Sequence, residues 1–450
     1  MTDGACCAVC LCDDGFLRTF ASLCGTAGSE AKTMKTVRFL TLGCKLNFAE
    51  SSELGKQLLA HGFVRAQPGE PATVCVVNTC SVTDAADHKG RQAIHRIRRE
   101  NPDALLVVTG CYAQLKPQEV ADIEGVDLVL GQQEKFSLVD FIQRLEHHEA
   151  DKINNTRTVD LRRFFPSASS DDRTRHFLKV QDGCDYYCTY CTIPMARGRS
   201  RNATIGSVVE AAEDIVRQGG REIVITGVNI GDFGRTTGET FIDLLRSLDE
   251  VQAPEGLRYR ISSCEPNLLT EEIIRFVAAS RHFAPHFHIP LQSGSDDVLR
   301  IMHRRYDRAL FASRVQTIRQ LMPHAFIGVD VMVGVRGETD MMFDDSRSFI
   351  SGLDVSQLHV FTYSERAGTR MLDVQPVIPQ RERQRRSRSM HALSEQKLQA
   401  FYAAQRGRTA TVLWEARRQA GQMSGFTENY VRVSAPYDSS KVNCFERITI

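Results

Sequence analysis

The stretch Gly183-Cys184-Asp185-Tyr186-Tyr187-Cys188-Thr189-Tyr190-Cys191 carries three thiols at the spacing C-x3-C-x2-C. Each iron of a cubane 4Fe–4S cluster takes one terminal sulfur ligand, so three thiolates leave the fourth iron open. An open position on a metal is where substrate chemistry takes place. A zinc knot is the alternative, but zinc needs four closing ligands and the next cysteine is Cys264. The stretch indicates a catalytic iron–sulfur site, with Tyr190 placed to lie against a flat ring.

Strand and helix patterns alternate outward from this loop over residues 175–375. The predicted strands are His176–Val180, Glu222–Thr226, Arg258–Ser262, His286–Pro290, Phe326–Val333 and Gln357–Phe361. Helical patterns lie between them, at Ile205–Gln218, Phe241–Leu248, Glu271–Ala279 and Met341–Ser351. Six such units predict an α/β fold with an open (βα)6 partial barrel. The cysteine loop follows the first strand and should therefore lie on the C-terminal face of the barrel.

A second alternating series covers residues 35–150. Strand patterns at Val37–Leu42, Thr73–Val77, Ala104–Thr109 and Val126–Leu130 precede helical patterns at Asn47–His61, Asp84–Glu100, Pro117–Ile123 and Lys135–His147. Short spacing between strands and helices predicts a doubly wound parallel sheet that is covered on both faces.

Three cysteines follow the first three strands of this series. Cys44, Cys80 and Cys111 each lie just past a strand end and beside a turn residue. Because ligands gather at the carboxyl ends of parallel strands, we expect the three thiols to converge. They could hold a second cluster with one open iron. The alternative is that they are buried structural cysteines, as we expect for Cys75 within the second strand.

The remaining segments differ in composition. Residues 1–34 carry Cys6, Cys7, Cys10, Cys12 and Cys24 and predict a disordered leader, or an upstream start with Met34 as the natural one; metal binding by the close cysteine pairs is the alternative. Residues 151–174 are polar and predict a linker, in which exposed charge is the simpler interpretation of Arg162 and Arg163.

The C-terminal segment, 376–450, is basic. It carries 13 Lys or Arg and 6 Asp or Glu, a net +7 in a chain of net +1, and five arginines lie on a predicted helix that runs to Gln405. Short strands at Thr409–Glu415, Tyr430–Ser434 and Glu446–Ile450 predict a small β-barrel, an architecture that binds nucleic acids. Trp414, Phe426 and Tyr430 either stack on bases or pack in the core.

The overall composition sets limits. The chain has 450 residues, 42% hydrophobic content and nearly balanced charge, so any RNA site must be a local patch. The sequence contains no run of 18 or more apolar residues, so it does not predict a membrane span. Fourteen cysteines in a long chain indicate metal ligation in a reducing compartment, which predicts a cytoplasmic protein.

Taken together, the cysteine loop and the stretches 41–47, 78–82 and 109–111 resemble the radical S-adenosylmethionine (SAM) methylthiotransferases over residues 35–450. The resemblance implies a 4Fe–4S cluster on Cys184, Cys188 and Cys191, whose open iron is chelated by SAM to yield a 5′-deoxyadenosyl radical. It also implies a second 4Fe–4S cluster, tied to sulfur insertion, on the other cysteine triad. The C-terminal domain resembles the RNA-binding TRAM domain.

The resemblance further implies that the loops after the barrel strands surround SAM. The implied contacts are Tyr190, Gly227, Asn229, Glu265, Gln292 and Ser293. We expect Cys264 to be a small buried hydrophobe. The stretch Arg197-Gly198-Arg199-Ser200-Arg201 either holds a substrate phosphate or caps the cysteine loop.

The implied activity is methylthiolation of an adenosine beside the tRNA anticodon. Lys45-Leu46-Asn47 resembles the branch that acts on threonylcarbamoyladenosine at position 37. Partners would be the tRNA anticodon stem-loop, an electron donor such as flavodoxin or ferredoxin, and an unknown sulfur donor. The alternatives are the branches acting on isopentenyl-adenosine or on a ribosomal-protein aspartate, an electron-transfer iron–sulfur protein, and an RNA-binding module with structural clusters.

Overall fold

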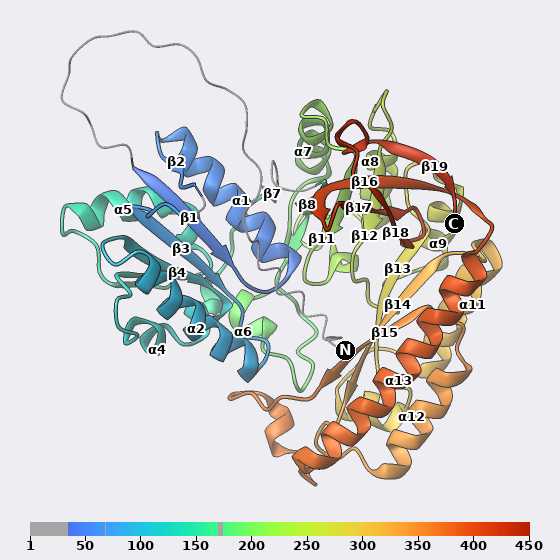
Figure 1. Cartoon of the computed structure of the whole chain (residues 1–450). Coiled ribbons are helices and arrows are strands. Elements are labelled where there is room, and N and C mark those ends of the chain that lie inside the picture. Colours follow the sequence, from blue (N-terminus) through green and yellow to red (C-terminus); the bar gives the residue numbers. More distant parts are fainter. Residues whose placement is uncertain (1–34, 68, 170–173) are drawn as a thin grey trace. The chain divides into compact units, whose positions relative to one another are not determined.

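A computed structural model describes residues 35–67, 69–169 and 174–450, so the predicted leader lies outside the described residues. The chain divides into two compact units, one ending at Arg157 and the other beginning at Thr158. Figure 1 shows the helices and strands of both units. The finer domain limits expected from the sequence stay a prediction.

The N-terminal unit contains a six-stranded sheet in the order β2-β1-β3-β4-β5-β6, in which every pairing is parallel. Its strands are β1 (Thr36–Thr41), β2 (Val64–Arg65), β3 (Val74–Thr79), β4 (Leu105–Gly110), β5 (Leu128–Leu130) and β6 (Ile153–Asn154). Its helices are α1 (Lys45–Ala60), α2 (Asp84–Glu100), α3 (Cys111–Leu115), α4 (Pro117–Ala121) and α5 (Leu138–Glu146), with the 3-10 turn η1 (Glu134–Ser137) before α5.

Alternate residues of β3 enter different hydrophobic clusters on the two faces of this sheet. Cys75 and Val77 pack with residues of α2, whereas Val74 and Val76 pack with residues of α1 and α5. Side chains on a strand alternate between faces, so a strand buried on both sides must be apolar throughout. The doubly wound prediction is therefore confirmed, and Cys75 is a core residue as expected.

Six parallel strands form the barrel of the second unit: β8 (Arg175–Lys179), β11 (Glu222–Thr226), β12 (Arg258–Ile261), β13 (His286–Gln292), β14 (Phe326–Val333) and β15 (Gln357–Thr362). Two isolated bridges, Tyr259 to Phe283 and Ser263 to His288, join β12 to the β13 side. The short strand β7 (Ser167–Ala168) pairs antiparallel with β8. The barrel is thus open between β7 and β15, and the (βα)6 prediction is confirmed.

Helices cover the outside of this barrel (Figure 1). They are α7 (Ile205–Arg217), α8 (Phe241–Asp249), α9 (Glu271–Ala279), α10 (Asp296–Ile301), α11 (Arg308–Leu321), α12 (Asp340–Gly352) and α13 (Gln380–Gln405), whereas the short helix α6 (Ile193–Arg197) follows the cysteine loop. The short elements are β9 (Gln181–Asp182), β10 (Arg201–Asn202), η2 (Thr158–Asp160), η3 (Ile230–Asp232) and η4 (Arg370–Asp373). Threonines cap α7, α8, α9 and α12, where each side chain accepts a backbone N–H of the first turn.

Helix α13 packs against the barrel, and its Met390 and Leu393 belong to the barrel's core cluster. Two of its arginines are buried: Arg386 pairs with Glu338 at 2.8 Å and Arg383 pairs with Glu365 at 3.0 Å. Ion pairing inside the protein occupies these two guanidiniums, so Arg383 and Arg386 are not part of an exposed basic surface.

The C-terminal strands β16 (Thr409–Gln419), β17 (Gln422–Thr427), β18 (Arg432–Pro436) and β19 (Phe445–Thr449) form an antiparallel sheet in the order β18-β17-β16-β19, with the turn η5 (Ser439–Lys441) before β19. This half-barrel includes β17, which we did not predict. A Cβ on Gly425 of β17 would lie 2.5 Å from the carbonyl oxygen of Leu413, so this strand requires glycine at a position that resembles a turn in the sequence.

The C-terminal sheet lies against the N-terminal ends of the barrel strands. Arg258, the first residue of β12, donates to the carbonyls of Thr411 and Phe426 at 3.1 and 3.0 Å. Arg260 donates to the carbonyls of Thr427 and Glu428 at 2.7 and 2.8 Å. The buried carboxylate of Glu222, the first residue of β11, accepts from both arginines.

The aromatic residues of this sheet pack internally. Trp414 is buried, with its indole N–H donating to Glu446 at 2.6 Å. The rings of Phe426 and Tyr430 stack 4.8 Å apart, and Arg175 lies over the Phe426 ring. Of the two roles that the sequence left open, the structure supports core packing.

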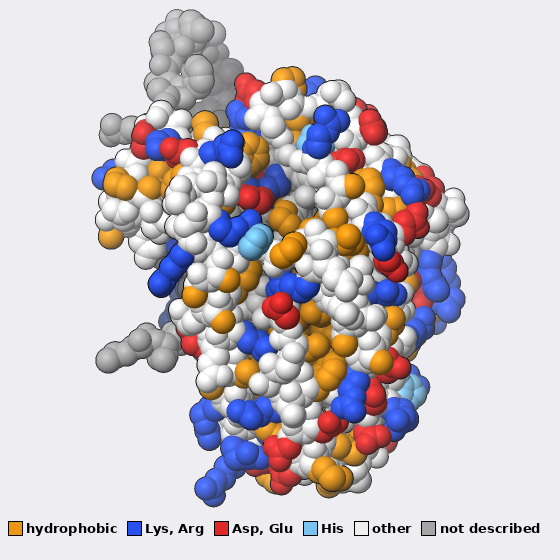
Figure 2. All heavy atoms as spheres, turned by 90° about the vertical axis from the view of Figure 1, so that its right-hand side faces the viewer, with side chains coloured by type: hydrophobic (Ala, Val, Ile, Leu, Met, Phe, Trp, Pro, Cys, Tyr) orange, Lys and Arg blue, Asp and Glu red, His pale blue; other side chains and the backbone are white. Residues whose placement is uncertain are grey.

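The surface carries mixed charge. Figure 2 shows basic and acidic side chains interspersed over one face of the molecule. Among the described residues, every helix is too short or too polar to cross a lipid bilayer.

Candidate functional site

The cysteine loop begins after β9, next to the carboxyl end of β8. Gly183 opens the loop with φ +71°, and a side chain there would collide with the carbonyl of Arg199. The backbone N–H of Cys184 donates to the carbonyl of Gly198 at 3.0 Å. The tight approach of the two segments places all three thiols in one loop on the C-terminal side of the barrel, as predicted.

Each sulfur of this loop accepts a hydrogen bond. Cys184 Sγ accepts from the N–H of Tyr186 and Cys191 Sγ from the N–H of Ile193, both at 3.4 Å. Burial, together with the proximity of the neighbouring thiols, raises the pKa of Cys184 and of Cys191 to about 12. Such thiols stay protonated when no metal is bound, so neither is an activated nucleophile.

Arg304 is the residue of this site that sequence reasoning missed. Its side chain is 3% exposed and donates to Cys188 Sγ at 3.0 Å, to the Tyr190 hydroxyl at 3.4 Å and to the Glu265 carboxylate. The guanidinium thus links the cysteine loop to the loop after β12. Positive charge beside a cysteine sulfur stabilises the anionic form that a metal requires.

A buried carboxylate directly precedes the cysteine loop and pairs with three cations. Asp182 pairs with Lys179 at 2.8 Å, with Arg197 at 3.0 Å and with Arg201 at 3.2 Å. Although burial opposes ionisation, these three cations hold the pKa of Asp182 well below its usual range. Arg197 and Arg201 therefore cap the loop, the second of the two roles considered for them.

Gln181 connects the cysteine loop with the loop after β11. Its side-chain N–H donates to the carbonyl of Gly183 at 2.7 Å, and its oxygen accepts from the N–H of Asn229 at 2.8 Å. A Cβ on Gly227 would lie 2.9 Å from that same oxygen, so this close approach requires glycine. The Asn229 side chain is 2% exposed and lacks a partner among the described residues at both of its polar atoms. An unsatisfied buried amide is suited to a ligand.

The other predicted SAM contacts differ in their surroundings. Burial raises the pKa of Glu265, which Arg304 partly offsets. Gln292 lies at a bulge in β13 with φ +66°, a strained conformation for this residue type. The fully buried hydroxyl of Ser293 accepts from the N–H of Ser295 at 3.2 Å, which is ordinary turn structure. A role in SAM binding stays a prediction for each of them.

The N-terminal cysteines follow three adjacent strands in matching register. Thr41 of β1 pairs with Asn78 of β3, which pairs with Thr109 of β4, and a cysteine lies two or three residues beyond each. Cys44 is exposed, Cys80 is half-buried and Cys111 is buried. The topology therefore brings all three to one edge of the sheet, where ligation stays our prediction.

Two glycines bring the loops at this edge close together. A Cβ on Gly43 (φ +106°) would lie 2.8 Å from Cys80 Cβ, and one on Gly110 (φ +98°) would lie 2.6 Å from Asn78 Oδ1. Asn47 joins the same loops by donating to the carbonyls of Leu42 and Thr79 at 2.8 and 3.0 Å. Both positions require the left-handed backbone that favours glycine.

A fully buried ion pair lies close to Cys111. Lys135 Nζ is 2.6 Å from Glu50 Oε2 and donates to Gln132 at 2.6 Å, while Gln132 donates to Cys111 Sγ at 3.6 Å. Sequence reasoning missed this group, because its members are 85 residues apart in the chain. The opposite charges of Lys135 and Glu50 neutralise each other next to the Cys111 thiol.

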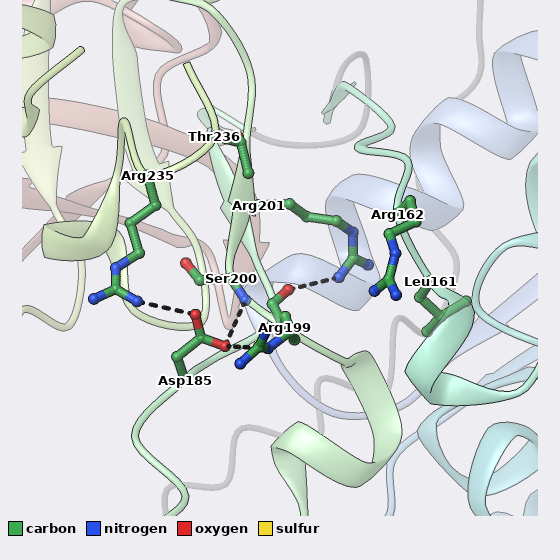
Figure 3. A pocket seen from close by; sticks show the side chains of 8 residues that line it. All are labelled: Leu161, Arg162, Asp185, Arg199, Ser200, Arg201, Arg235 and Thr236. Atoms are coloured by element: carbon green, nitrogen blue, oxygen red, sulfur yellow. Dashed lines mark hydrogen bonds and ion pairs between the residues drawn. The ribbon is translucent and has the colours of Figure 1, made fainter. Parts of the chain in front are cut away.

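A basic pocket of about 440 Å³ adjoins the cysteine loop. Its lining includes Arg162, Arg199, Arg201 and Arg235 together with Asp185. Figure 3 shows Arg199 and Arg235 directed toward Asp185, with Arg162 and Arg201 on the other side of the pocket. Arg235 lies 3.0 Å and Arg199 3.6 Å from that carboxylate. Arg201 is already paired with Asp182, and Arg235 also lies 3.5 Å from Asp232. The exposed guanidiniums of Arg162, Arg199 and Arg235 still make the pocket suited to an anionic ligand such as phosphate.

Family models match both units of the chain. Residues 36–131 match the Uncharacterized protein family UPF0004, and residues 178–350 match the Radical SAM superfamily. The two regions contain the first and the second cysteine triad, respectively.

Individual proteins are similar over most of the chain. Threonylcarbamoyladenosine tRNA methylthiotransferase MtaB of Bacillus subtilis is 36% identical over 89% of this chain and 90% of its own length. The tRNA-2-methylthio-N(6)-dimethylallyladenosine synthase of Syntrophotalea carbinolica is 29% identical over 88% and 92%. Among solved structures, the radical SAM methyltransferase TsrM of Kitasatospora setae has a TM-score of 0.55 at 16% identity and covers 72% of both chains, which supports the fold alone.

Proposed function

The chain belongs to the radical SAM tRNA methylthiotransferases, and from this we propose that it converts N6-threonylcarbamoyladenosine at position 37 of tRNA to the 2-methylthio derivative. The observation that carries the substrate assignment is the 36% identity over nine-tenths of the length of a relative named for threonylcarbamoyladenosine. Relatives named for dimethylallyladenosine are less similar, at 29% identity over 88% of the chain and 33% identity over 75% of it.

The residues of the two cysteine triads fit the cofactors of this family. Cys184, Cys188 and Cys191 would hold one 4Fe–4S cluster, because three thiols and a buried arginine suit an anionic cluster with an open iron. The N-terminal triad would hold the second. When bound, the two clusters and SAM supply the one-electron chemistry, the methyl group and the sulfur for insertion.

The chain's own residues bind and orient around that centre. Arg304 places a fixed positive charge at Cys188 and holds Glu265 toward the same point. The unsatisfied amide of Asn229 and the backbone exposed at Gly227 offer hydrogen bonds and space to a polar ligand. Tyr190 contributes a ring that is packed with Met302, Tyr363 and Met371 and is therefore held in one orientation. Preorganised groups of this kind need no rearrangement during the reaction.

The basic pocket is where we place the RNA backbone. The side chain of Arg199 is 72% exposed and that of Arg235 is 48% exposed, so both can reach a phosphate. They flank Asp185, the residue after Cys184, so a phosphate held there brings the nucleotide next to the cysteine loop. The partners of the reaction are then the tRNA anticodon stem-loop, an electron donor such as flavodoxin or ferredoxin, and a sulfur donor.

Nucleoside analysis tests the proposal. The chain is expressed in a strain whose tRNA carries both threonylcarbamoyl- and isopentenyl-adenosine but no methylthiolated form of either, and digested tRNA is analysed by mass spectrometry. We expect 2-methylthio-threonylcarbamoyladenosine with the natural chain and with the control Cys444→Ser, and none with Cys184→Ser.

A second candidate substrate, isopentenyl-adenosine, is favoured by the 29% identity to the dimethylallyladenosine synthase. Accumulation of its 2-methylthio derivative in the same digest would overturn the substrate assignment. Unmodified tRNA in the presence of folded, cluster-loaded protein would overturn the proposed function itself.

A further inference from the structure

Three polar side chains from adjacent barrel strands converge to one point. His288 on β13, Asp330 on β14 and His359 on β15 place one ligand atom each within 4.8 Å of the others. Their neighbours in the chain, such as Ile289, Val329 and Leu358, belong to the hydrophobic core beneath the helices. Because side chains alternate between the two faces of a strand, the three polar residues face the barrel lumen.

The three ligand atoms form a nearly equilateral triangle. His288 Nε2 lies 2.8 Å from Asp330 Oδ1 and 2.9 Å from His359 Nδ1, and His359 Nδ1 lies 3.2 Å from Asp330 Oδ1. The two imidazole rings are 4.9 Å apart between centroids. All three contacts are within hydrogen-bond distance.

Protons alone cannot satisfy all three contacts at once. An ionised carboxylate only accepts, so each histidine nitrogen must carry a proton to bond Asp330. In that state two N–H groups face one another across 2.9 Å. Removing one proton restores the contact between the histidines but turns a nitrogen lone pair toward the carboxylate. A cation at the centre satisfies the three atoms together.

The dimensions suit a metal ion. Ligands held about 2.1 Å from a metal and about 90° apart are about 3.0 Å from each other, close to the observed sides of 2.8, 2.9 and 3.2 Å. Two imidazoles and one carboxylate on one face of an octahedron are a known ligand set for divalent transition metals, with three positions left for water or substrate oxygen.

The surroundings also favour a cation. The side chains of His288, Asp330 and His359 are 20%, 17% and 26% exposed, so the point is reachable yet partly desolvated. Among the described residues, the ion pairs of Asp330 are with these two histidines and with neither Lys nor Arg. Gly328 lies beside both rings, where a Cβ would be 3.4 Å from the ring of His288 and 3.5 Å from that of His359, so no bulky side chain separates the two imidazoles.

We propose that His288, Asp330 and His359 form a mononuclear divalent transition-metal site in the barrel lumen, separate from both cysteine triads. This site goes beyond the proposed function, because its occupancy does not depend on which nucleoside is modified. A bound ion offers a Lewis acid to an anionic oxygen that enters the lumen.

Manganese binding tests the site in the purified full chain. Mn²⁺ prefers oxygen and nitrogen ligands to thiolates, so it avoids the cysteine triads, and loss of its free EPR signal counts the bound ion. We expect about one Mn²⁺ per chain, and at least about tenfold weaker binding for each of His288→Gln, Asp330→Asn and His359→Gln.

The control is His282→Gln, since His282 lies 3.5 Å from Asp249 in a pair that has no third ligand within the described part of the chain. This variant should bind Mn²⁺ as the natural chain does. Circular dichroism checks that each variant folds. If a variant does not fold, Mn²⁺ binding by the natural chain still tests the proposal. Absence of bound Mn²⁺ in the natural chain, or binding that survives all three substitutions, would overturn the proposal.

Discussion

Substituting Glu222 with Gln should loosen the C-terminal sheet from the barrel. Glu222 is fully buried and accepts from Arg258 Nε at 2.6 Å and from Arg260 Nε at 2.9 Å. Burial raises its pKa, but the two guanidiniums outweigh burial and lower the pKa from the usual 4.5 to about 2. At about 1.4 kcal/mol per pKa unit, this shift corresponds to about 3 kcal/mol of stabilisation by the ionised carboxylate.

The cost of removing the charge follows from the same contacts. Burial also lowers the pKa of Arg258 to about 10, so desolvation of that guanidinium offsets part of the gain from pairing. In Glu222→Gln both guanidiniums stay buried without a carboxylate, a change that typically destabilises by about 3 to 5 kcal/mol. We expect the free energy of unfolding to fall by about 3 kcal/mol, near the lower end of this range.

The chain's single tryptophan makes this change measurable. Trp414 lies buried in β16, so its fluorescence during urea unfolding reports on the C-terminal sheet. The midpoint of this transition should fall by the equivalent of about 3 kcal/mol in Glu222→Gln. The control Glu255→Gln removes a carboxylate that is 76% exposed and pairs with Arg221, and should change the stability by less than about 1 kcal/mol.

Acid titration gives the sign of the same effect. A carboxyl whose folded pKa is lowered contributes stability above its unfolded pKa and loses that contribution as the pH falls through the folded value. The natural chain should therefore lose this contribution between pH 4.5 and about 2, and Glu222→Gln should not. Equal midpoints for Glu222→Gln and Glu255→Gln would refute the reasoning.

Three further predictions concern the cysteine triads and the basic pocket. Cys44→Ser should reduce bound iron from about eight to about four atoms per chain and abolish methylthiolation. The control Cys75→Ser, in the core of β3, should keep both the iron and the activity. An iron assay and nucleoside analysis measure the two properties. Arg304→Gln removes charge-assisted bonds worth about 1.5 to 3 kcal/mol and should slow product formation about 10- to 100-fold, with unchanged tRNA affinity in a binding assay. Arg199→Gln should lower the salt slope of tRNA binding by about 0.9 in filter-binding titrations, while Arg217→Gln on α7 should leave it unchanged.

Periodic segments were predictable almost to the residue. The helix expected at Asp84–Glu100 and the strands expected at Glu222–Thr226 and Phe326–Val333 have these bounds in the structure. Helix α2 is amphipathic and has its N-cap at Thr83, whereas the two strands are mostly buried runs that are each followed by a glycine. The position of Cys44, Cys80 and Cys111 at one edge of the sheet was also predictable, because the carboxyl ends of parallel strands share one edge.

Contacts between distant segments were not predictable. Arg304 reaches Cys188 across 116 positions, and nothing in its local pattern distinguishes it from an exposed arginine. Arg383 and Arg386 belong to an arginine-rich run that suggests a solvated surface, yet Glu338 and Glu365 bury them in ion pairs. Only the fold decides which charges of such a run face inward.

The depth of the barrel separates the C-terminal sheet from the cysteine loop. The C-terminal sheet covers the end where the strands begin, and the cysteine loop lies beyond the end of β8. The eight residues of β14 span about 26 Å at about 3.3 Å each. Any nucleotide held by the sheet is therefore several nucleotides away from the one that reacts. If the tRNA of the proposed reaction also contacts the sheet, charges there would change how long it stays bound, whereas the choice of the modified base would rest with the opposite end.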